Sequence, residues 1–154
     1  MEIHIAHTAA CAEPVRQSAN LHLHRCPETS SAFGLWGTAI AHAEADYVAV
    51  LDLQVPPAPC WRERVRREIE RGTPLFFGAV ELGWKSDDVR TVGYLCEYAQ
   101  FAAPLRPGLR EVPGNNLVGQ RELIAGHLGR LGFDKTVLLR RLALPPVAIE
   151  GMPV

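Results

Sequence analysis

The chain has 154 residues, of which 47% are hydrophobic and 21% charged, and its formal net charge is −1. A normal apolar content with almost no net charge excludes an intrinsically disordered chain, and the lack of a basic excess excludes a general nucleic-acid-binding protein. No apolar run approaches the ~20 residues that span a bilayer, and the N-terminus lacks the layout of a signal peptide, so we expect one cytoplasmic domain without a transmembrane segment.

The first half of the chain alternates strand-like and helix-like segments, which is typical of an α/β protein. Residues 2–7 alternate apolar and polar side chains and predict a strand, whereas residues 8–30 are polar and read as irregular. Apolar residues at helical spacing predict a helix from Ala32 onward. The nearly continuous apolar run at 47–53 predicts a central strand covered on both faces, as in a parallel sheet.

The second half continues this alternation after a proline-rich turn. Residues 61–72 predict an amphipathic helix whose five arginines and three glutamates are typical of a solvated surface held by i,i+4 ion pairs. An anion-binding face is the alternative. The remaining predicted elements are a strand at 75–83, a helix at 91–103, a strand at 115–119, helices at 121–128 and 135–144, and a final short strand at 147–151.

Three polar positions are candidates for chemistry. Asp52 ends the buried strand, at the edge where open α/β sheets bind ligands, although an aspartate there is also a common turn residue. Asn115 and Asn116 follow a Pro-Gly pair and are either turn formers or amides suited to sugar hydroxyls. Asp134 is either the N-cap of the last helix or a general base.

The cysteines do not predict a functional site. Cys11, Cys26, Cys60 and Cys96 lie far apart without a CxxC motif, which predicts reduced, mostly buried thiols.

The histidines give only a weak indication of a metal site. On a strand His4 and His7 point to opposite faces, whereas His22 and His24 share one. Because no acidic residue or cysteine accompanies them in a recognised metal spacing, a small zinc enzyme is the minor alternative.

Five segments, taken in order, carry a resemblance. A helix rich in small residues, AFGLWGTAIAHA, precedes ADYVAVLD and then VPPAPCWRERV. Further along come VPGNNLVGQRELI and GFDKTVLLRRL. From about residue 30 to 150 this order resembles the family-2 glycosyltransferases of the GT-A fold, in which comparable segments read "gDyvafLDdD", "pp.Wl", "pGnNvayrRelL" and "GF.kT…L".

The resemblance implies a fold and an activity. The fold is a three-layer α/β sandwich with a mixed, mostly parallel sheet, formed as a single domain over 1–154 that lacks the family's first strand–helix unit. The activity is transfer of a sugar from a nucleotide sugar to an unknown acceptor, with Mn²⁺ or Mg²⁺ as cofactor. Asp52 would bind the metal, Gln54, Asn115 and Asn116 would contact the nucleotide sugar or substrate, and Asp134 falls where the catalytic base often lies.

The sequence departs from the family at the acidic motif, where Asp52-Leu53-Gln54 replaces Asp-x-Asp. An amide is a weaker ligand than a carboxylate for a hard cation. The alternative hypothesis is therefore a catalytically inactive remnant of the glycosyltransferase fold that serves as a binding or assembly module. Because loss of the first strand would expose a sheet edge, we also expect a homodimer.

Overall fold

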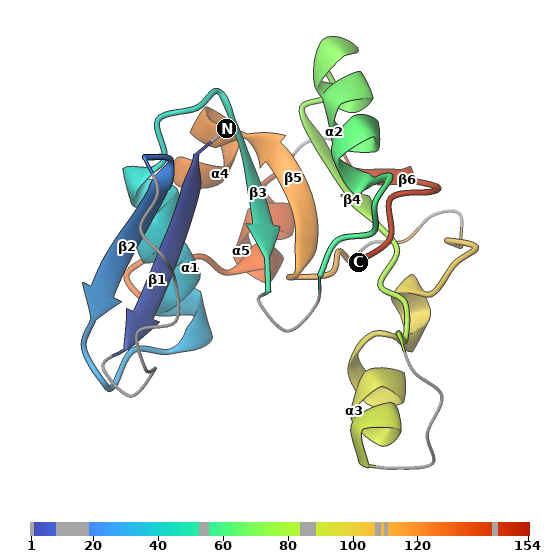
Figure 1. Cartoon of the computed structure of the whole chain (residues 1–154), viewed down its shortest axis with the longest axis horizontal. Helices are drawn as coiled ribbons and strands as arrows, with labels where there is room; N and C mark the ends of the chain where they lie inside the picture. Colours follow the sequence, from blue (N-terminus) through green and yellow to red (C-terminus); the bar gives the residue numbers. More distant parts are fainter. Residues whose placement is uncertain are drawn as a thin grey trace. The chain divides into compact units, whose positions relative to one another are not determined.

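The computed structural model describes residues 2–8, 19–52, 56–83, 89–106, 109, 111–142 and 145–154. These residues form a mixed α/β structure, as the sequence predicts (Figure 1). Its elements are β1 (Ile3–Thr8), β2 (Leu21–Cys26), α1 (Ala32–His42), β3 (Tyr47–Leu51), α2 (Trp61–Glu70), β4 (Leu75–Gly78), α3 (Val89–Glu97), the 3₁₀ helix η1 (Ala99–Phe101), β5 (Asn116–Gln120), α4 (Arg121–Ala125), α5 (Lys135–Arg141) and β6 (Val147–Ile149).

The chain divides into two compact units. The first comprises Met1–Val48 and Gln120–Arg141, and the second comprises Ala49–Gly119 and Leu142–Val154. Strands β3 and β5 each pass from one unit into the other. The expected single domain over 1–154 stays a prediction.

The first unit is built on a two-stranded parallel sheet. β1 and β2 pair in register from Ile3 opposite Leu21 to Thr8 opposite Cys26 (Figure 1). The prediction that residues 8–30 are irregular is therefore wrong at β2. This strand alternates leucine and histidine, and imidazoles occupy the positions where a core-forming strand would carry apolar side chains.

Helix α1 packs against the two strands and begins where the sequence predicts. Its N-cap is Ser31, whose Oγ accepts a hydrogen bond from the Gly34 N–H at 3.2 Å. Gly37 allows the loop before α5 to approach closely, because a Cβ there would lie 2.7 Å from Cα of Gly132. The Phe133 N–H then donates to the Phe33 carbonyl at 2.9 Å.

The second sheet contains four strands in the order β3-β5-β4-β6. β4 is antiparallel to β5 and parallel to β6. The Arg121 N–H, at the end of β5, donates to the Asp46 carbonyl, just before β3, at 2.8 Å. The start of β3 thus adjoins the end of β5, so these neighbours run antiparallel (Figure 1). The sheet is mixed, as predicted, but antiparallel pairs predominate among its described strands.

The prediction of a central position for β3 is wrong. In the described sheet β3 is an edge strand, with Val48 and Val50 buried and Ala49 exposed. A small alanine between two valines gives the strand an apolar composition although only one of its faces is covered. The apolar run therefore indicated that both faces of the strand are buried, whereas in the structure buried and exposed side chains alternate along it.

The core of the second unit lies around β4 and β5. Its fully buried apolar side chains are those of Phe76, Phe77, Phe101, Val112, Leu117, Val118 and Met152. Helix α2 ends at Glu70, before Gly72, which has a φ of +72° that favours glycine. The predicted helix at 91–103 is instead α3 followed by η1.

The described cysteines are free thiols, as expected, but they are not mostly buried. Cys26 is buried, whereas Cys60 and Cys96 are exposed. Cys11 lies outside the described residues. Cys60 directly precedes α2, and Cys96 lies in α3.

Candidate functional site

The ends of two neighbouring strands bring sequence-predicted residues to one sheet edge. Asp52 directly follows β3, and Asn115 directly precedes β5. Because the two strands are antiparallel neighbours, the carboxyl end of β3 lies at the amino end of β5. The second unit thus presents a carboxylate and an asparagine at the same edge of its sheet. Gln54 lies outside the described residues.

Asn116 is a buried structural amide. Its Nδ2 donates to the Ala79 carbonyl at 2.9 Å and to the Met152 carbonyl at 2.7 Å, and its Oδ1 accepts from Trp61 Nε1 at 2.8 Å. Both amide hydrogens are therefore used, and the side chain has no exposed surface. Gly78 makes room for this arrangement, since a Cβ there would overlap the Met152 carbonyl and lie 2.6 Å from Asn116 Nδ2.

Asn115 differs sharply from its neighbour. Its side chain is also buried, with 1% of its surface exposed, yet neither Oδ1 nor Nδ2 has a hydrogen-bond partner among the described residues. A buried amide without a partner costs about 1–3 kcal/mol. Such a cost at the edge that also carries Asp52 is characteristic of a group that is completed by a ligand or bound water.

Tyr98 lies near Asp52 and was not among the site residues that the sequence predicts. Burial raises the pKa of its hydroxyl, and the negative charges of Glu97 and Asp52 raise it further. The phenol is therefore protonated at neutral pH and able to donate a hydrogen bond. Tyr98 stacks with Tyr94, whose hydroxyl donates to the Val80 carbonyl at 2.9 Å and thereby anchors the pair to the core.

Asp134 caps a helix in the first unit. Its Oδ1 accepts from the N–H groups of Thr136 at 2.8 Å and of Val137 at 3.4 Å, as an N-cap of α5 does. This confirms the capping hypothesis for the side chain. Its additional role as a general base stays a prediction.

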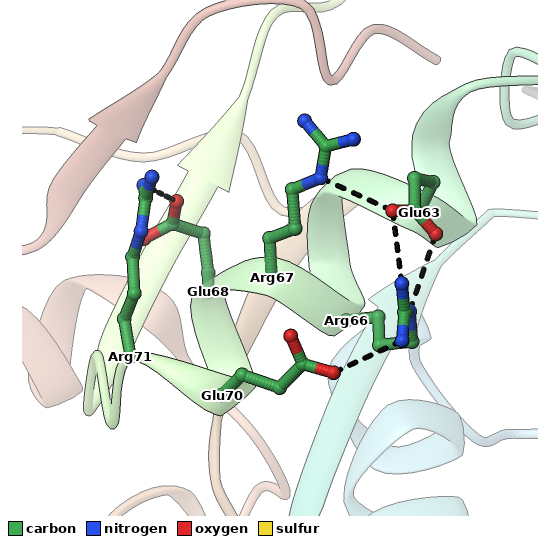
Figure 2. A network of polar contacts seen from close by, with 6 residues as sticks. All are labelled: Glu63, Arg66, Arg67, Glu68, Glu70 and Arg71. Carbon is green, nitrogen blue, oxygen red and sulfur yellow. Dashed lines mark hydrogen bonds and ion pairs between the residues drawn. The ribbon is translucent and has the colours of Figure 1, made fainter.

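The charged face of α2 is the solvated helix surface that the sequence predicts. Figure 2 shows Glu63 accepting from Arg66 and Arg67, and Arg66 also reaching Glu70 at 3.1 Å. Hydrogen bonds from both arginines lower the pKa of Glu63. Since these guanidinium groups are engaged by carboxylates of their own helix, the network offers no support for an anion-binding face.

The same figure shows one buried member of the α2 network. Glu68 is 6% exposed and accepts from Arg71 at 2.6 Å (Figure 2). It also accepts from the Thr73 hydroxyl at 2.9 Å. These contacts close the turn that leads from α2 into β4. The carboxylate is thus structural.

A pocket of about 330 Å³ lies elsewhere in the second unit. Phe77, Leu105 and Pro146 give it an apolar lining, to which Arg106 and Glu150 add opposite charges. None of the sequence-predicted site residues lines it. Nothing in the described residues specifies an occupant for this pocket.

The first unit contains a cluster of four imidazoles, which the sequence indicated only weakly. The His4 ring stacks on His22 at 4.7 Å and on His24 at 5.3 Å, and His24 packs against His42 at 4.2 Å. Burial and the neighbouring imidazoles lower the pKa of His24. The sequence shows that His22 and His24 would share one face of a strand, but not that β1 pairs with β2 and brings His4 to the same face.

Comparison with known proteins identified no relative. No family model matches the chain, and neither a curated protein nor a solved structure is significantly similar to it. Within the part of the chain that the structure describes, no helix is long and apolar enough to cross a membrane.

The contrast between the two asparagines predicts different effects of the same substitution. Asn116→Ala should lower the free energy of unfolding by at least ~2 kcal/mol, because it leaves the Trp61 N–H and two carbonyls without their partner. Asn115→Ala removes no hydrogen bond among the described residues and should cost less than about 1 kcal/mol. Urea unfolding of both variants measures the difference, and equal losses would contradict the distinction.

Proposed function

We propose that this chain is a nucleotide-sugar-binding domain of the glycosyltransferase type, which transfers a sugar to an unknown acceptor. The observation that carries the proposal is the shared edge of β3 and β5, with Asp52 and the unpartnered Asn115 amide. This edge combines a carboxylate for a cation–diphosphate with an amide for sugar hydroxyls. The resemblance in the flanking ADYVAVLD and VPGNNLVGQRELI segments supports the same function.

Mn²⁺ or Mg²⁺ would be the cofactor, with the Asp52 carboxylate as its protein ligand. Mg²⁺ is commonly held by one or two carboxylates together with substrate phosphates, without a complete protein cage. Asp52 alone suits that mode. We therefore expect metal and nucleotide to bind together, and the metal would neutralise charge on the diphosphate.

The remaining residues would position the substrate. Asn115 offers two donors and an acceptor, enough to orient adjacent hydroxyl groups of a sugar. Tyr98, protonated and within the electrostatic influence of Asp52, would donate to a phosphate or hydroxyl oxygen. Because leaving-group stabilisation and orientation account for much of the rate in group transfer, these contacts are the ones that the proposed activity needs.

Nucleotide binding should therefore raise the melting temperature only when metal is present. A screen of UDP, GDP, dTDP and their sugars, with and without Mn²⁺, should identify one stabilising nucleotide. At one hundred times the dissociation constant the stabilisation is ~2.7 kcal/mol, a shift of several degrees. Asp52→Asn should abolish the shift. Asp46→Asn, at the opposite end of β3, is the matched control and should retain it.

No metal-dependent shift with any nucleotide, or an equal shift in Asp52→Asn, would contradict the proposal.

A second candidate function is a non-catalytic binding or assembly module of the same fold. Two observations favour it: Asn116 has both amide hydrogens committed to the core, and Asp134 is committed to capping α5. In this case the shared edge of β3 and β5 would bind a ligand without catalysing a reaction. A homodimer belongs to either candidate, because β1 and β2 are both edge strands of their sheet and expose Ile3 and Leu23.

Asp134 provides a test of its predicted role as a general base. Asparagine caps helices as well as aspartate does, so Asp134→Asn should keep wild-type stability, whereas Asp134→Ala should lose about 1 kcal/mol. Release of nucleoside diphosphate from the stabilising nucleotide sugar is then measured in Asp134→Asn. Loss of release in this stably folded variant would identify a base, and unchanged release would assign Asp134 to capping alone.

A further inference from the structure

Two histidines of the cluster and the nearby Glu2 form a group that could hold a metal ion. Glu2, His4 and His22 each offer a ligating atom, and these atoms all lie within 4.8 Å of one another. The parallel register places His4 directly opposite His22, so both side chains project from the same face of the β1–β2 sheet. Glu2 precedes His4 by two residues, the spacing that returns a side chain to the same face of an extended chain.

The two nitrogens of His4 have distinct surroundings. Nδ1 lies 3.0 Å from His24 Nε2, which is a good hydrogen-bond distance. Nε2 lies 3.5 Å from Glu2 Oε2, which is longer than the 2.7–3.2 Å typical of an N–H···O bond. Two ligands at about 2.0 Å from a tetrahedral metal are separated by about 3.3 Å. The His4–Glu2 distance therefore suits a shared cation better than a direct hydrogen bond.

The hydrogen bond between His4 and His24 determines which nitrogen is available. When His4 Nδ1–H donates to His24 Nε2, the lone pair of His4 Nε2 faces the Glu2 carboxylate. In this tautomer a cation between the two atoms would interact favourably with both. A metal-bound histidine whose other nitrogen is hydrogen-bonded in this way is the usual arrangement in metalloproteins.

The fold holds His24 in this position from two sides. Its register partner on β1 is Ala6, whose small side chain leaves room for the His24 ring to reach the His4 nitrogen. On the other side His24 packs against His42 at the end of α1. The His42 Nδ1–H donates to the Thr38 carbonyl at 2.8 Å, which fixes the orientation of that ring as well.

The geometry points to a binding site for a divalent transition metal, of the class of Zn²⁺, with Glu2, His4 and His22 as ligands and His24 as a positioning residue. Imidazole and carboxylate are ligands that zinc prefers, and three protein ligands leave a coordination position for water. Such an ion would link β1 to β2. This site belongs to the first unit, whereas Asp52 belongs to the second.

Calorimetric titration of the full chain with zinc chloride, without a histidine tag, tests the site directly. We expect saturable binding of one ion per chain and a higher melting temperature in zinc. His4→Gln should abolish binding, whereas Glu2→Gln and His22→Gln should each weaken it. Loss of an outer-shell partner typically costs 10–100-fold in metal affinity, so we expect about that loss in His24→Gln.

His7→Gln is the matched control. His7 lies on the opposite face of β1, and its Nδ1 contacts the Thr8 carbonyl at 3.1 Å, so its substitution should leave zinc affinity unchanged. Glu2→Gln changes an exposed carboxylate and keeps the test decisive even where His4→Gln fails to fold. Absence of saturable binding, or equal affinity in wild type, Glu2→Gln and His22→Gln, would overturn the site.

The zinc titration and the nucleotide-binding assay test the two proposals independently, because the proposed ligands lie in different units. Asp52→Asn should bind zinc as the wild type does, and Glu2→Gln should keep the nucleotide-dependent thermal shift. Loss of zinc binding in Asp52→Asn would overturn the assignment of the ligands to the β1–β2 sheet.

Discussion

The second unit depends on one buried amide. Asn116 joins the first residue of α2, the segment after β4 and the segment after β6 through three hydrogen bonds in a region without solvent. Each of its partners would otherwise be a buried polar group without a partner, which is costly. With this residue held in place, the amino end of β5 is held as well, and with it the position of Asn115 beside the carboxyl end of β3.

Adjacent asparagines thus have opposite character. Asn116 has its amide hydrogens fully used and serves the core, whereas Asn115 is equally buried and has no partner among the described residues. A fold tolerates such an unsatisfied group where a ligand completes it. This asymmetry is the reason that we propose a substrate contact for Asn115, with Asn116 as its support.

The two proposed cation sites have different chemistry. The β3–β5 edge offers a single carboxylate, which suits a hard cation that arrives with phosphate oxygens. The β1–β2 sheet offers two imidazoles and a carboxylate, which suit a transition metal bound by protein alone. Because the ligand types differ, a single solution containing both metals would be expected to fill the sites selectively.

The sequence predicted most helices because their apolar spacing and caps are local signals, as at Ser31 and Asp134. It missed β2, although Leu21-His22-Leu23-His24 alternates apolar and polar side chains, because the surrounding residues 8–30 are mostly polar. It misplaced β3 because an apolar composition does not reveal whether a strand lies at a sheet edge. The histidine cluster depends on the register of two strands joined across a long segment, which spacing along the chain does not encode.

The central claim is that Asn115, and not Asn116, contacts the ligand. Side-chain amide resonances in a ¹H–¹⁵N correlation spectrum report on both residues in one titration with the stabilising nucleotide and Mn²⁺ replaced by diamagnetic Mg²⁺. The account predicts a large shift of the Asn115 amide and an unchanged Asn116 amide, which stays bonded to Ala79 and Met152. An unperturbed Asn115 amide at saturating nucleotide would contradict it.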